Sequence, residues 1–300
     1  MAAERRLLGP HVAVLFGPAK GKYPDGNTVI VCGRDSTLAI DPSLSVRDEP
    51  NPVVVDRVLL THPHEDHVAG LSSVRHGEVL VHCADAEGLR SLDGLMRLYG
   101  IPEAEWPSMT AMVQERFHVE PRPDAVAFEH GDEWELGGVT VRAVAAPGHT
   151  SGHTVFLIES DSGERVVVTG DIDLTSFGPY YGDASSDLGA FERSLREVRE
   201  LVADHYVTFH HKGVVDGHDA FVAAVDAYAA VIGQREHSLL ALLGAPVTLD
   251  ALVDIGIVYR PGTRPPLFGD SVERRTIAQH LDRLVSDSAV GTDGHQYWRR

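Results

Sequence analysis

Short apolar runs, each followed by a polar or glycine-containing segment, recur along most of the chain. Residues 53–60, VVVDRVLL, form such a run, and its β-branched residues predict a buried strand. Three later runs follow the same pattern and predict further strands, at residues 139–146, 165–169 and 205–209. Nearer the N-terminus, residues 27–32 and 38–41 predict two strands joined by a hairpin.

Helical segments lie between and after these predicted strands. Residues 84–100 and 103–117 predict two helices. Toward the C-terminus, the sequence predicts short helices at 237–243 and 248–253 and an amphipathic helix at 271–285. Three helices followed by a hairpin-like stretch resemble a winged helix. We therefore expect two domains, at residues 1–236 and 237–300.

Metal-binding side chains follow the first of these strands directly. The segment 61–67, THPHEDH, places His62, His64, Asp66 and His67 within six residues. Imidazole nitrogen and carboxylate oxygen are ligands that suit zinc and iron. Packing explains such a run poorly, because histidine and aspartate are costly to bury unpaired. A solvated polar loop is the alternative interpretation, and the context favours the metal site.

Each of the three later strands also leads into a candidate ligand. The candidates are His149 in the segment PGHT, Asp171 in TGD, and the pair His210 and His211 in HHKG. Alone, an aspartate after a glycine would more often be a turn residue. Four strands that all end in metal-binding side chains are a much more specific signal, because loops at strand ends are where sites are usually built.

Together these segments resemble the metallo-β-lactamase superfamily, and they are most similar to its glyoxalase-II-like branch. The resemblance rests on THPHEDHVAG, PGHTSGHT, TGD and HHKG, in that order, and covers about residues 25–235. It implies an α/β fold, a four-layer αββα sandwich with a two-metal site at one edge of the sheets. It also implies a ligand set, with His62, His64 and His149 on the first metal, Asp66, His67 and His211 on the second, and Asp171 bridging them.

The last histidine ligand is a choice between two neighbours. Consecutive strand side chains point to opposite faces, so only one of His210 and His211 can face the metal if the strand persists. Family members usually have a small residue before this histidine and a glycine after it, and we prefer His211. Two further residues are expected near the metals. Asp41 fits the aspartate that supports the metal loop, with a plain turn as the alternative. His153 is either a partner of the ligands or a buried, satisfied histidine.

The implied cofactors are two divalent metal ions, with zinc as the default and iron or manganese compatible with the same ligands. Two such ions lower the pKa of water from 15.7 to about 7 and make a metal-bridging hydroxide available at neutral pH. Asp66 is the expected catalytic residue, orienting this hydroxide and shuttling its proton. In similar lactonases a tyrosine contacts the substrate carbonyl, and Tyr180 or Tyr181 is the expected substrate-binding counterpart.

The favoured activity is hydrolysis of an ester or thioester. The alternatives within the same fold are an RNA endonuclease, suggested by the C-terminal domain, and a lactonase. A regulator that only binds a ligand is disfavoured, because it has no need of a full ligand set. A true β-lactamase is also disfavoured, since the best-known zinc β-lactamases have a cysteine near the position of Asp171. The segment G-x-S-x-G is absent, so a serine hydrolase of that kind has no support.

Charge argues against a nucleic-acid partner. The chain has 26 Lys and Arg and 44 Asp and Glu, a net charge of −18. The last 64 residues hold seven of each, so residues 1–236 carry the whole imbalance. A polyanion binder normally shows a basic footprint, and we expect a small-molecule substrate instead. The main basic group near the C-terminus comprises Arg274, Arg275, Arg283, Arg299 and Arg300, for which packing or a homodimer contact is the preferred role.

The remaining composition bears on location. The two cysteines, Cys32 and Cys83, are too few for a disulfide framework in a chain of 300 residues. The N-terminal segment MAAERRLLGP has no long apolar stretch, so the sequence predicts neither a signal peptide nor a membrane-spanning helix. We therefore expect a cytoplasmic protein.

Overall fold

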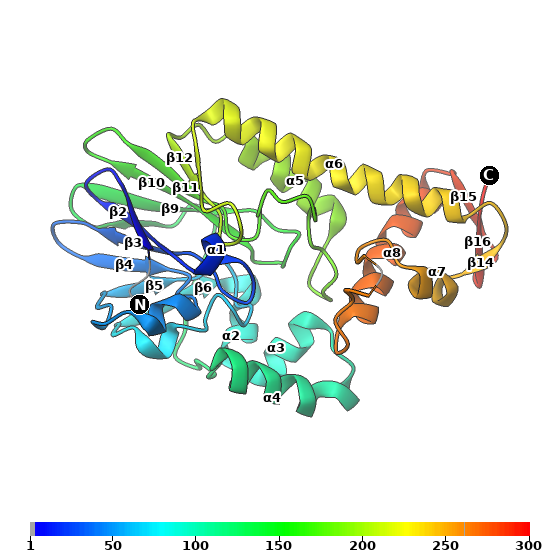
Figure 1. The fold of residues 1–300 in the computed structure, drawn as a ribbon, viewed down its shortest axis with the longest axis horizontal. Coiled ribbons are helices and arrows are strands. Elements are labelled where there is room, and N and C mark those ends of the chain that lie inside the picture. Colours follow the sequence, from blue (N-terminus) through cyan, green and yellow to red (C-terminus); the bar gives the residue numbers. More distant parts are fainter. Residues whose placement is uncertain (1–3, 261) are drawn as a thin grey trace.

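Two β-sheets stacked face to face form the centre of the structure, a computed structural model that describes residues 4–260 and 262–300 (Figure 1). The first sheet has seven strands in chain order, β1 (Glu4–Leu8), β2 (Val12–Phe16), β3 (Thr28–Cys32), β4 (Thr37–Ile40), β5 (Arg57–Leu59), β6 (Glu78–His82) and β7 (Val126–Phe128). The second has six strands in the order β13 (Val214–Asp216), β12 (His205–Val207), β11 (Arg165–Val168), β10 (Thr154–Ser160), β9 (Val139–Ala145) and β8 (Glu133–Glu135).

Helices cover the outer face of each sheet. The α-helices are α1 (Pro18–Gly21), α2 (Ala86–Arg90), α3 (Leu92–Tyr99), α4 (Trp106–Phe117), α5 (Leu188–Arg199), α6 (His218–Leu242), α7 (Leu249–Ile255) and α8 (Gly269–Ser286). Shorter 3₁₀ turns are η1 (Leu44–Asp48), η2 (Leu71–Ser73), η3 (Cys83–Asp85) and η4 (Glu103–Glu105). Among the described residues, no helix is both long and apolar enough to cross a lipid bilayer.

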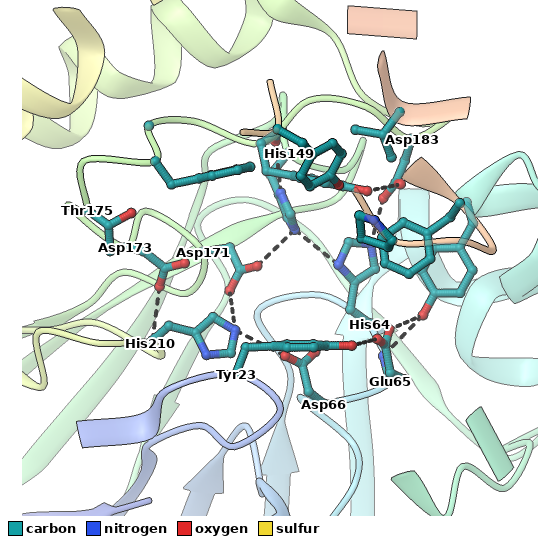
Figure 2. A pocket seen from close by; sticks show the side chains of 18 of the residues that line it. Tyr23, His64, Glu65, Asp66, His149, Asp171, Asp173, Thr175, Asp183 and His210 are labelled. Atoms are coloured by element: carbon teal, nitrogen blue, oxygen red, sulfur yellow. Dashed lines mark hydrogen bonds and ion pairs between the residues drawn. The ribbon is translucent and has the colours of Figure 1, made fainter. Parts of the chain in front are cut away.

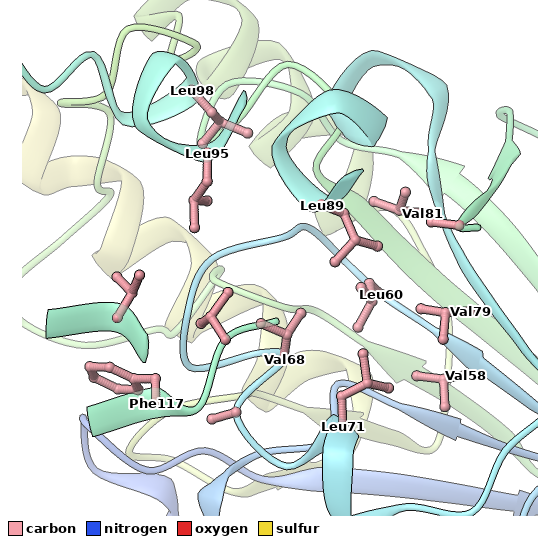
Figure 3. Packing of buried hydrophobic residues seen from close by; sticks show 14 of the residues in the cluster. Val58, Leu60, Val68, Leu71, Val79, Val81, Leu89, Leu95, Leu98 and Phe117 are labelled. Atoms are coloured by element: carbon pink, nitrogen blue, oxygen red, sulfur yellow. The ribbon is translucent and has the colours of Figure 1, made fainter. Parts of the chain in front are cut away.

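The four layers follow from strands that are apolar on both faces. In β6, Val79 and Val81 pack with α2 to α4 (Figure 3). Leu80, between them in sequence, packs between the two sheets. In β10, Phe156 lies between the sheets, and Leu157 packs with α5 and α6. Successive side chains of a strand point to opposite faces, so each strand serves two cores. The predicted αββα sandwich is confirmed.

The topology brings four strand ends to one edge of the sandwich. In the first sheet, β4 to β7 run parallel to one another. In the second, β9 and β11 both pair antiparallel with β10, and β12 runs parallel to β11. The strands β9, β11 and β12 therefore share a direction, and their carboxyl ends meet at one edge. The loops that leave them carry the histidines and the aspartate singled out in the sequence.

The C-terminal part forms a smaller unit on the extended end of α6 (Figure 1). It contains α7, α8 and a three-stranded sheet of β14 (Val247–Thr248), β16 (Gln296–Arg299) and β15 (Val290–Thr292), around its own apolar core. Thr248 caps α7, as the sequence predicts, by accepting from the Ala251 amide at 3.3 Å. The helix predicted at 237–243 is wrong as a separate element. Residues 218–242 contain no proline, so α6 continues through the predicted domain boundary. The winged-helix classification stays a prediction.

Polar contacts fix this unit against the sandwich. The guanidinium of Arg275 donates to the carbonyls of Tyr99, Gly100 and Gly182. Four residues further along α8, the Gln279 side chain donates to the Tyr181 carbonyl at 2.8 Å and accepts from the Leu188 amide at 2.6 Å. Helix α8 is thereby held beside the end of α3 and the loop that follows β11.

Candidate metal centre

The loop after β5 is anchored by an aspartate from the neighbouring strand. Asp41 follows β4, adopts a left-handed backbone conformation with φ of 49°, and is almost fully buried. Its carboxylate accepts from the Thr61 amide at 2.8 Å and from the Thr61 hydroxyl at 2.7 Å. It also lies 3.0 Å from Nδ1 of His67. The expectation that Asp41 supports this loop by hydrogen bonding is confirmed.

Three imidazoles and one carboxylate converge in a first group. Nε2 of His149 lies 3.1 Å from Nε2 of His62 and 3.1 Å from Nδ1 of His64. The Oδ2 atom of Asp171 is 3.2 Å from the same His149 nitrogen. These atoms all lie within 4.8 Å of one another, and the histidines are buried. The structure thus brings together residues that lie far apart in the sequence (Figure 2).

A second group contains Asp66, His67 and His210. Nε2 of His210 lies 3.0 Å from Oδ2 of Asp66. Nε2 of His67 lies 2.9 Å from Oδ1 of Asp171, whose other oxygen faces the first group. Asp171 therefore stands between the two groups, where a bridging carboxylate is expected.

The outward nitrogen of every imidazole in both groups lies within 3.1 Å of an oxygen atom. The oxygen partners are Thr61 Oγ1 for His62 (3.1 Å), Asp183 Oδ2 for His64 (2.8 Å), Asp41 Oδ2 for His67 (3.0 Å), the Tyr180 carbonyl for His149 (3.0 Å), and the carbonyls of Gly21 and Asp25 for His210 (both 2.9 Å). Carbonyl and carboxylate oxygens can only accept, so they bind the N–H of a histidine and turn its other nitrogen inward. Metal-ligating histidines are commonly held in this way.

The pKa values in the two groups are shifted in both directions. Burial lowers the pKa of His62 and of His149 well below the ordinary value, which keeps these imidazoles neutral. Burial alone would raise the pKa of Asp171, but the imidazoles of His67 and His149 outweigh it and hold that pKa well below its usual range.

Burial alone would lower the pKa of His64, His67 and His210, but neighbouring carboxylates outweigh it: Asp183 raises the pKa of His64 to about 9, Asp41 and Asp171 raise that of His67 well above its ordinary value, and Asp173 and Asp66 raise that of His210 to about 10. Neutral imidazole and ionised carboxylate are the forms that bind metal, so a divalent cation bound here would displace these protons. Nitrogen and oxygen ligands in these groups fit a divalent cation such as zinc.

The structure corrects the choice between the two adjacent histidines. His210 is buried and joins the second group, whereas His211 is exposed and has φ of 61°. The strand β12 ends at Val207, so the alternation of strand side chains does not reach this pair. The His210 amide donates to Oδ1 of Asp173 at 2.9 Å, and this contact helps to aim its ring at the cluster. The preference for His211 is therefore wrong.

The two tyrosines predicted to bind substrate have different surroundings. Tyr180 lines the cavity beside the metal centre, and its hydroxyl donates to Oδ1 of Asp183 at 3.0 Å. Tyr181 is 1% exposed, and its hydroxyl lies 3.0 Å from Nε2 of His280 on α8. Because Tyr181 packs against the C-terminal unit, the prediction that it binds substrate is wrong. Tyr180 stays a candidate.

His153 contacts the centre from behind. Its Nδ1 lies 3.1 Å from the Ala146 carbonyl, and its Nε2 accepts from the Asp171 amide at 3.2 Å. His153 therefore positions the backbone of the bridging aspartate and is not itself in either group. Of the two interpretations, the structure favours a partner of the ligands over an isolated buried histidine.

The sequence did not single out Glu65, although it lies within the histidine motif. Its buried carboxylate accepts from the Tyr99 hydroxyl at 2.5 Å and from the Tyr23 hydroxyl at 3.2 Å. Both tyrosines come from segments distant in sequence. The only sequence feature that could have drawn attention to Glu65 is its place inside the histidine motif. That place does not predict that two tyrosines bind its carboxylate.

A cavity of about 330 Å³ opens beside the two groups. Its walls include five of the seven side chains in the two groups (all but His62 and His67), several aromatic rings, and residues of the loop before α8 and of α8 itself. The lining residues most distant in sequence from the histidine motif are Tyr259, Pro265, Phe268, Val272 and Arg275. A pocket of this size, apolar with a few convergent polar groups, is typical of a small-molecule site.

Asp183 is a second residue that the sequence did not identify. It is 4% exposed, and its Oδ2 and the His64 Nε2, 2.8 Å apart, have no well-aligned hydrogen-bond partner among the described residues. This close contact fixes the His64 ring with Nδ1 turned inward, 3.1 Å from Nε2 of His149. Because the hydroxyl of Tyr180 also donates to this carboxylate, Asp183 connects a candidate ligand with a candidate substrate contact.

We expect Asp183→Asn to weaken metal binding by roughly 10–100-fold, as loss of a partner of a ligating histidine commonly does. The side chain keeps its shape but loses the charge that orients His64. Titration of the apoprotein with zinc against a competing chelator measures the change, and the exposed Asp282→Asn provides a matched control. Unchanged affinity in Asp183→Asn would show that packing alone orients the His64 ring.

Comparison with known proteins places this geometry in a family. The model described as "Metallo-beta-lactamase superfamily" matches residues 23–211. A metallo-beta-lactamase family protein from Thermus thermophilus has a similar structure, with a TM-score of 0.69 and 24% identity, over 98% of this chain and 100% of that chain. At this identity the likeness shows the fold alone, and it extends over the C-terminal unit.

Two curated proteins are similar in sequence. The atrochrysone carboxyl ACP thioesterase of Passalora fulva is 26% identical over 205 residues, which cover 64% of this chain and 51% of that protein. The probable polyketide biosynthesis zinc-dependent hydrolase BaeB of Bacillus velezensis is 23% identical over 180 residues, which cover 57% of this chain and 65% of that protein. The match thus spans about half the length of the thioesterase.

Proposed function

The chain belongs to the metallo-β-lactamase superfamily, and on this basis we propose that it is a dinuclear metal-dependent hydrolase of a small or medium ester or thioester. The names of the two curated relatives, a thioesterase and a zinc-dependent hydrolase, support this activity. The proposed ligands are His62, His64 and His149 for one ion, Asp66, His67 and His210 for the other, and Asp171 for both.

The observation that carries the proposal is the orientation of the five imidazoles. Each has its outward nitrogen on an oxygen partner and its inward nitrogen in the cluster. The Nε2 atoms of His62 and His149 face each other at 3.1 Å, and burial lowers the pKa of both imidazoles, so a shared cation would stabilise this contact. A packed polar core would instead pair each such nitrogen with a donor.

The proposed reaction assigns separate roles to the metal ions, to Asp66 and to Tyr180. Two bound divalent ions lower the pKa of water and polarise a carbonyl oxygen. Asp66 is 4% exposed and faces the cavity, where its carboxylate can orient the attacking water and take its proton. The Tyr180 hydroxyl lines the cavity and is the candidate donor to the substrate carbonyl as negative charge develops there. Its single hydrogen, donated to Asp183 in this structure, would turn to that oxygen.

The structure gives little support to the RNA endonuclease alternative. Three of the five arginines in the C-terminal basic group are engaged within the chain. Arg274 donates to Asp250 at 2.7 Å, Arg275 to backbone carbonyls, and Arg283 to Glu192 at 2.9 Å. Lactone opening remains a second candidate, because an apolar cavity beside the metal centre suits a lactone as well as an open ester.

A hydrolysis panel on metal-quantified protein tests the proposed activity. We expect turnover of acyl thioesters and aryl esters that stops when a chelator removes the metal and returns on adding zinc, with little cleavage of single-stranded RNA. Lactones belong in the same panel, since they separate the two candidate substrates. The proposal would be contradicted if RNA were the only substrate hydrolysed, or if the chelator did not reduce the hydrolysis rate.

A further inference from the structure

The cavity beside the metal centre is lined by many side chains that are not metal ligands. Beyond the histidines and carboxylates, its walls carry aromatic and aliphatic side chains from several distant segments. Tyr23 comes from the N-terminal part, Ile101 and Met109 from the region of α3 and α4, Phe177 from the loop after β11, and Phe268 from the residue before α8. These side chains surround the space that a substrate group next to the scissile bond would enter.

The described residues that line this cavity include no lysine or arginine that is free to pair with a substrate anion. Arg275 is their only lysine or arginine, and its guanidinium is already bound to three backbone carbonyls. A carboxylate or phosphate on the part of the acyl group away from the proposed metal ions would therefore lose its water without gaining a counter-charge from a lysine or arginine side chain. An unpaired charge in such a place is strongly disfavoured.

The acidic side chains of the cavity are likewise engaged. Glu65 accepts from two tyrosine hydroxyls, Asp183 pairs with His64 and Tyr180, and Asp173 accepts from the His210 amide. A positively charged substrate group would have to compete with these partners. An uncharged group meets no such cost, and it gains contact with the aromatic walls.

The volume of the cavity limits which part of the substrate can enter it. An apolar cavity of about 150 Å³ can hold a benzene ring. The cavity of about 330 Å³ must also hold the scissile group beside the metal centre, so it leaves room for an acyl group of roughly one to two rings. A carrier thiol is joined to a larger body that this space cannot enclose, so the acyl side of a thioester is the part that fits.

From these observations, and resting on the proposed function, we infer that the site selects esters or thioesters whose acyl group is uncharged and apolar or aromatic. The C-terminal unit supplies one wall of the acyl pocket, through Tyr259, Phe268 and Val272. Arg275 contributes by fixing that wall to the sandwich rather than by binding the substrate. The C-terminal unit is in this view a specificity element.

Three matched thioesters of N-acetylcysteamine test the inference on the full-length metal-loaded protein. They carry phenylacetyl, 4-carboxyphenylacetyl and 4-(trimethylammonio)phenylacetyl groups, with the acetyl thioester as a reference. After correction for spontaneous hydrolysis, we expect kcat/KM for the neutral aryl compound to exceed that for the carboxylate by roughly 100-fold. The cationic compound is expected to fall between them. Equal or faster turnover of either charged compound overturns the inference.

Two variants connect the preference to the pocket walls. Phe268→Ala is expected to lower the ratio of phenylacetyl to acetyl turnover by roughly tenfold, because contact area is lost. Phe177 is 41% exposed, so Phe177→Lys can place an ammonium at the cavity without burying it. This variant should raise the relative turnover of the carboxylate compound by roughly fivefold. Val202→Ala, at an exposed position away from the lining residues, is the control and should change neither ratio.

The acetyl thioester separates the two hypotheses. If neither these thioesters nor the aryl esters of the hydrolysis panel are hydrolysed in a chelator-dependent way, the proposed function fails. If acetyl and aryl thioesters are hydrolysed but charge makes no difference, only the acyl-pocket inference fails. Unchanged ratios in both Phe268→Ala and Phe177→Lys would also reject it, since the acyl group would then lie elsewhere.

Discussion

Replacing Asp171 with alanine should abolish metal-dependent hydrolysis, with the largest effect of any single change. Its two carboxylate oxygens face different groups, 2.9 Å from Nε2 of His67 and 3.2 Å from Nε2 of His149. In the proposed two-metal centre, both ions would lose a ligand together with this negative charge. We expect turnover to fall by roughly 10³-fold or more, because the pKa of water returns from about 7 toward 15.7 when the ions are lost. Metal content and hydrolysis rate, measured on the same preparation, give the result.

The conservative variant Asp171→Asn separates charge from shape. Asparagine preserves the size of the side chain and one carbonyl oxygen, but it cannot neutralise two cations. Both variants should therefore lose metal, while circular dichroism verifies that each is folded. Retention of full metal content and full activity in folded Asp171→Ala would rule out the bridging role and require a different ligand between the groups.

His210→Ala should damage metal binding far more than His211→Ala. The ring of His210 contacts Asp66 at 3.0 Å and is held by two backbone carbonyls, whereas the ring of His211 lies at the surface. Loss of a direct ligand should cost at least as much as the roughly 10–100-fold that loss of an outer partner costs, and we expect about 100-fold or more in affinity for the second ion. His211→Ala should stay within about twofold of the native protein, as surface changes usually do.

Zinc titration of the two apoproteins provides the measurement for this pair. His211→Asn is a useful addition, since asparagine tolerates the left-handed backbone conformation, with φ of 61°, better than alanine does. The opposite ranking, with His211→Ala losing metal and His210→Ala retaining it, would contradict the arrangement of the two rings described above.

Much of the sandwich was readable from local patterns. The apolar runs at 139–146 and 165–169 became β9 and β11, since strands in this sandwich are buried on both faces and their apolar residues stand out from the loops. The run at 53–60 was less well predicted, because only Arg57–Leu59 pairs as a regular strand and Val54 forms an isolated bridge. Strand length depends on which neighbours the backbone can pair with, and this information lies outside the run.

The C-terminal unit shows a different limit. Helices α7 and α8 were predicted from a threonine cap and an amphipathic pattern, which are local signals. The extent of α6 was not predicted correctly, because whether a helix ends at a domain boundary depends on what packs beside it. The part that this unit plays in lining the cavity could not be read at all. Phe268 is far along the chain from the histidine motif at residues 61–67, and it reaches the cavity only after folding brings α8 beside the metal centre.

Residue type and local pattern were enough to find most of the metal-binding side chains and to place them after strands. Ligand chemistry depends on residue type, and the apolar runs identify the strand ends, so His62, His64, Asp66, His67, His149 and Asp171 were all found. The choice between His210 and His211 required the folded chain, as did the discovery of Asp183 and of the wall formed by Phe268. In each case the deciding contact comes from a segment remote in sequence, such as the carbonyls of Gly21 and Asp25 that hold the ring of His210. A local pattern cannot encode such a contact, because it exists only once the sheets have packed.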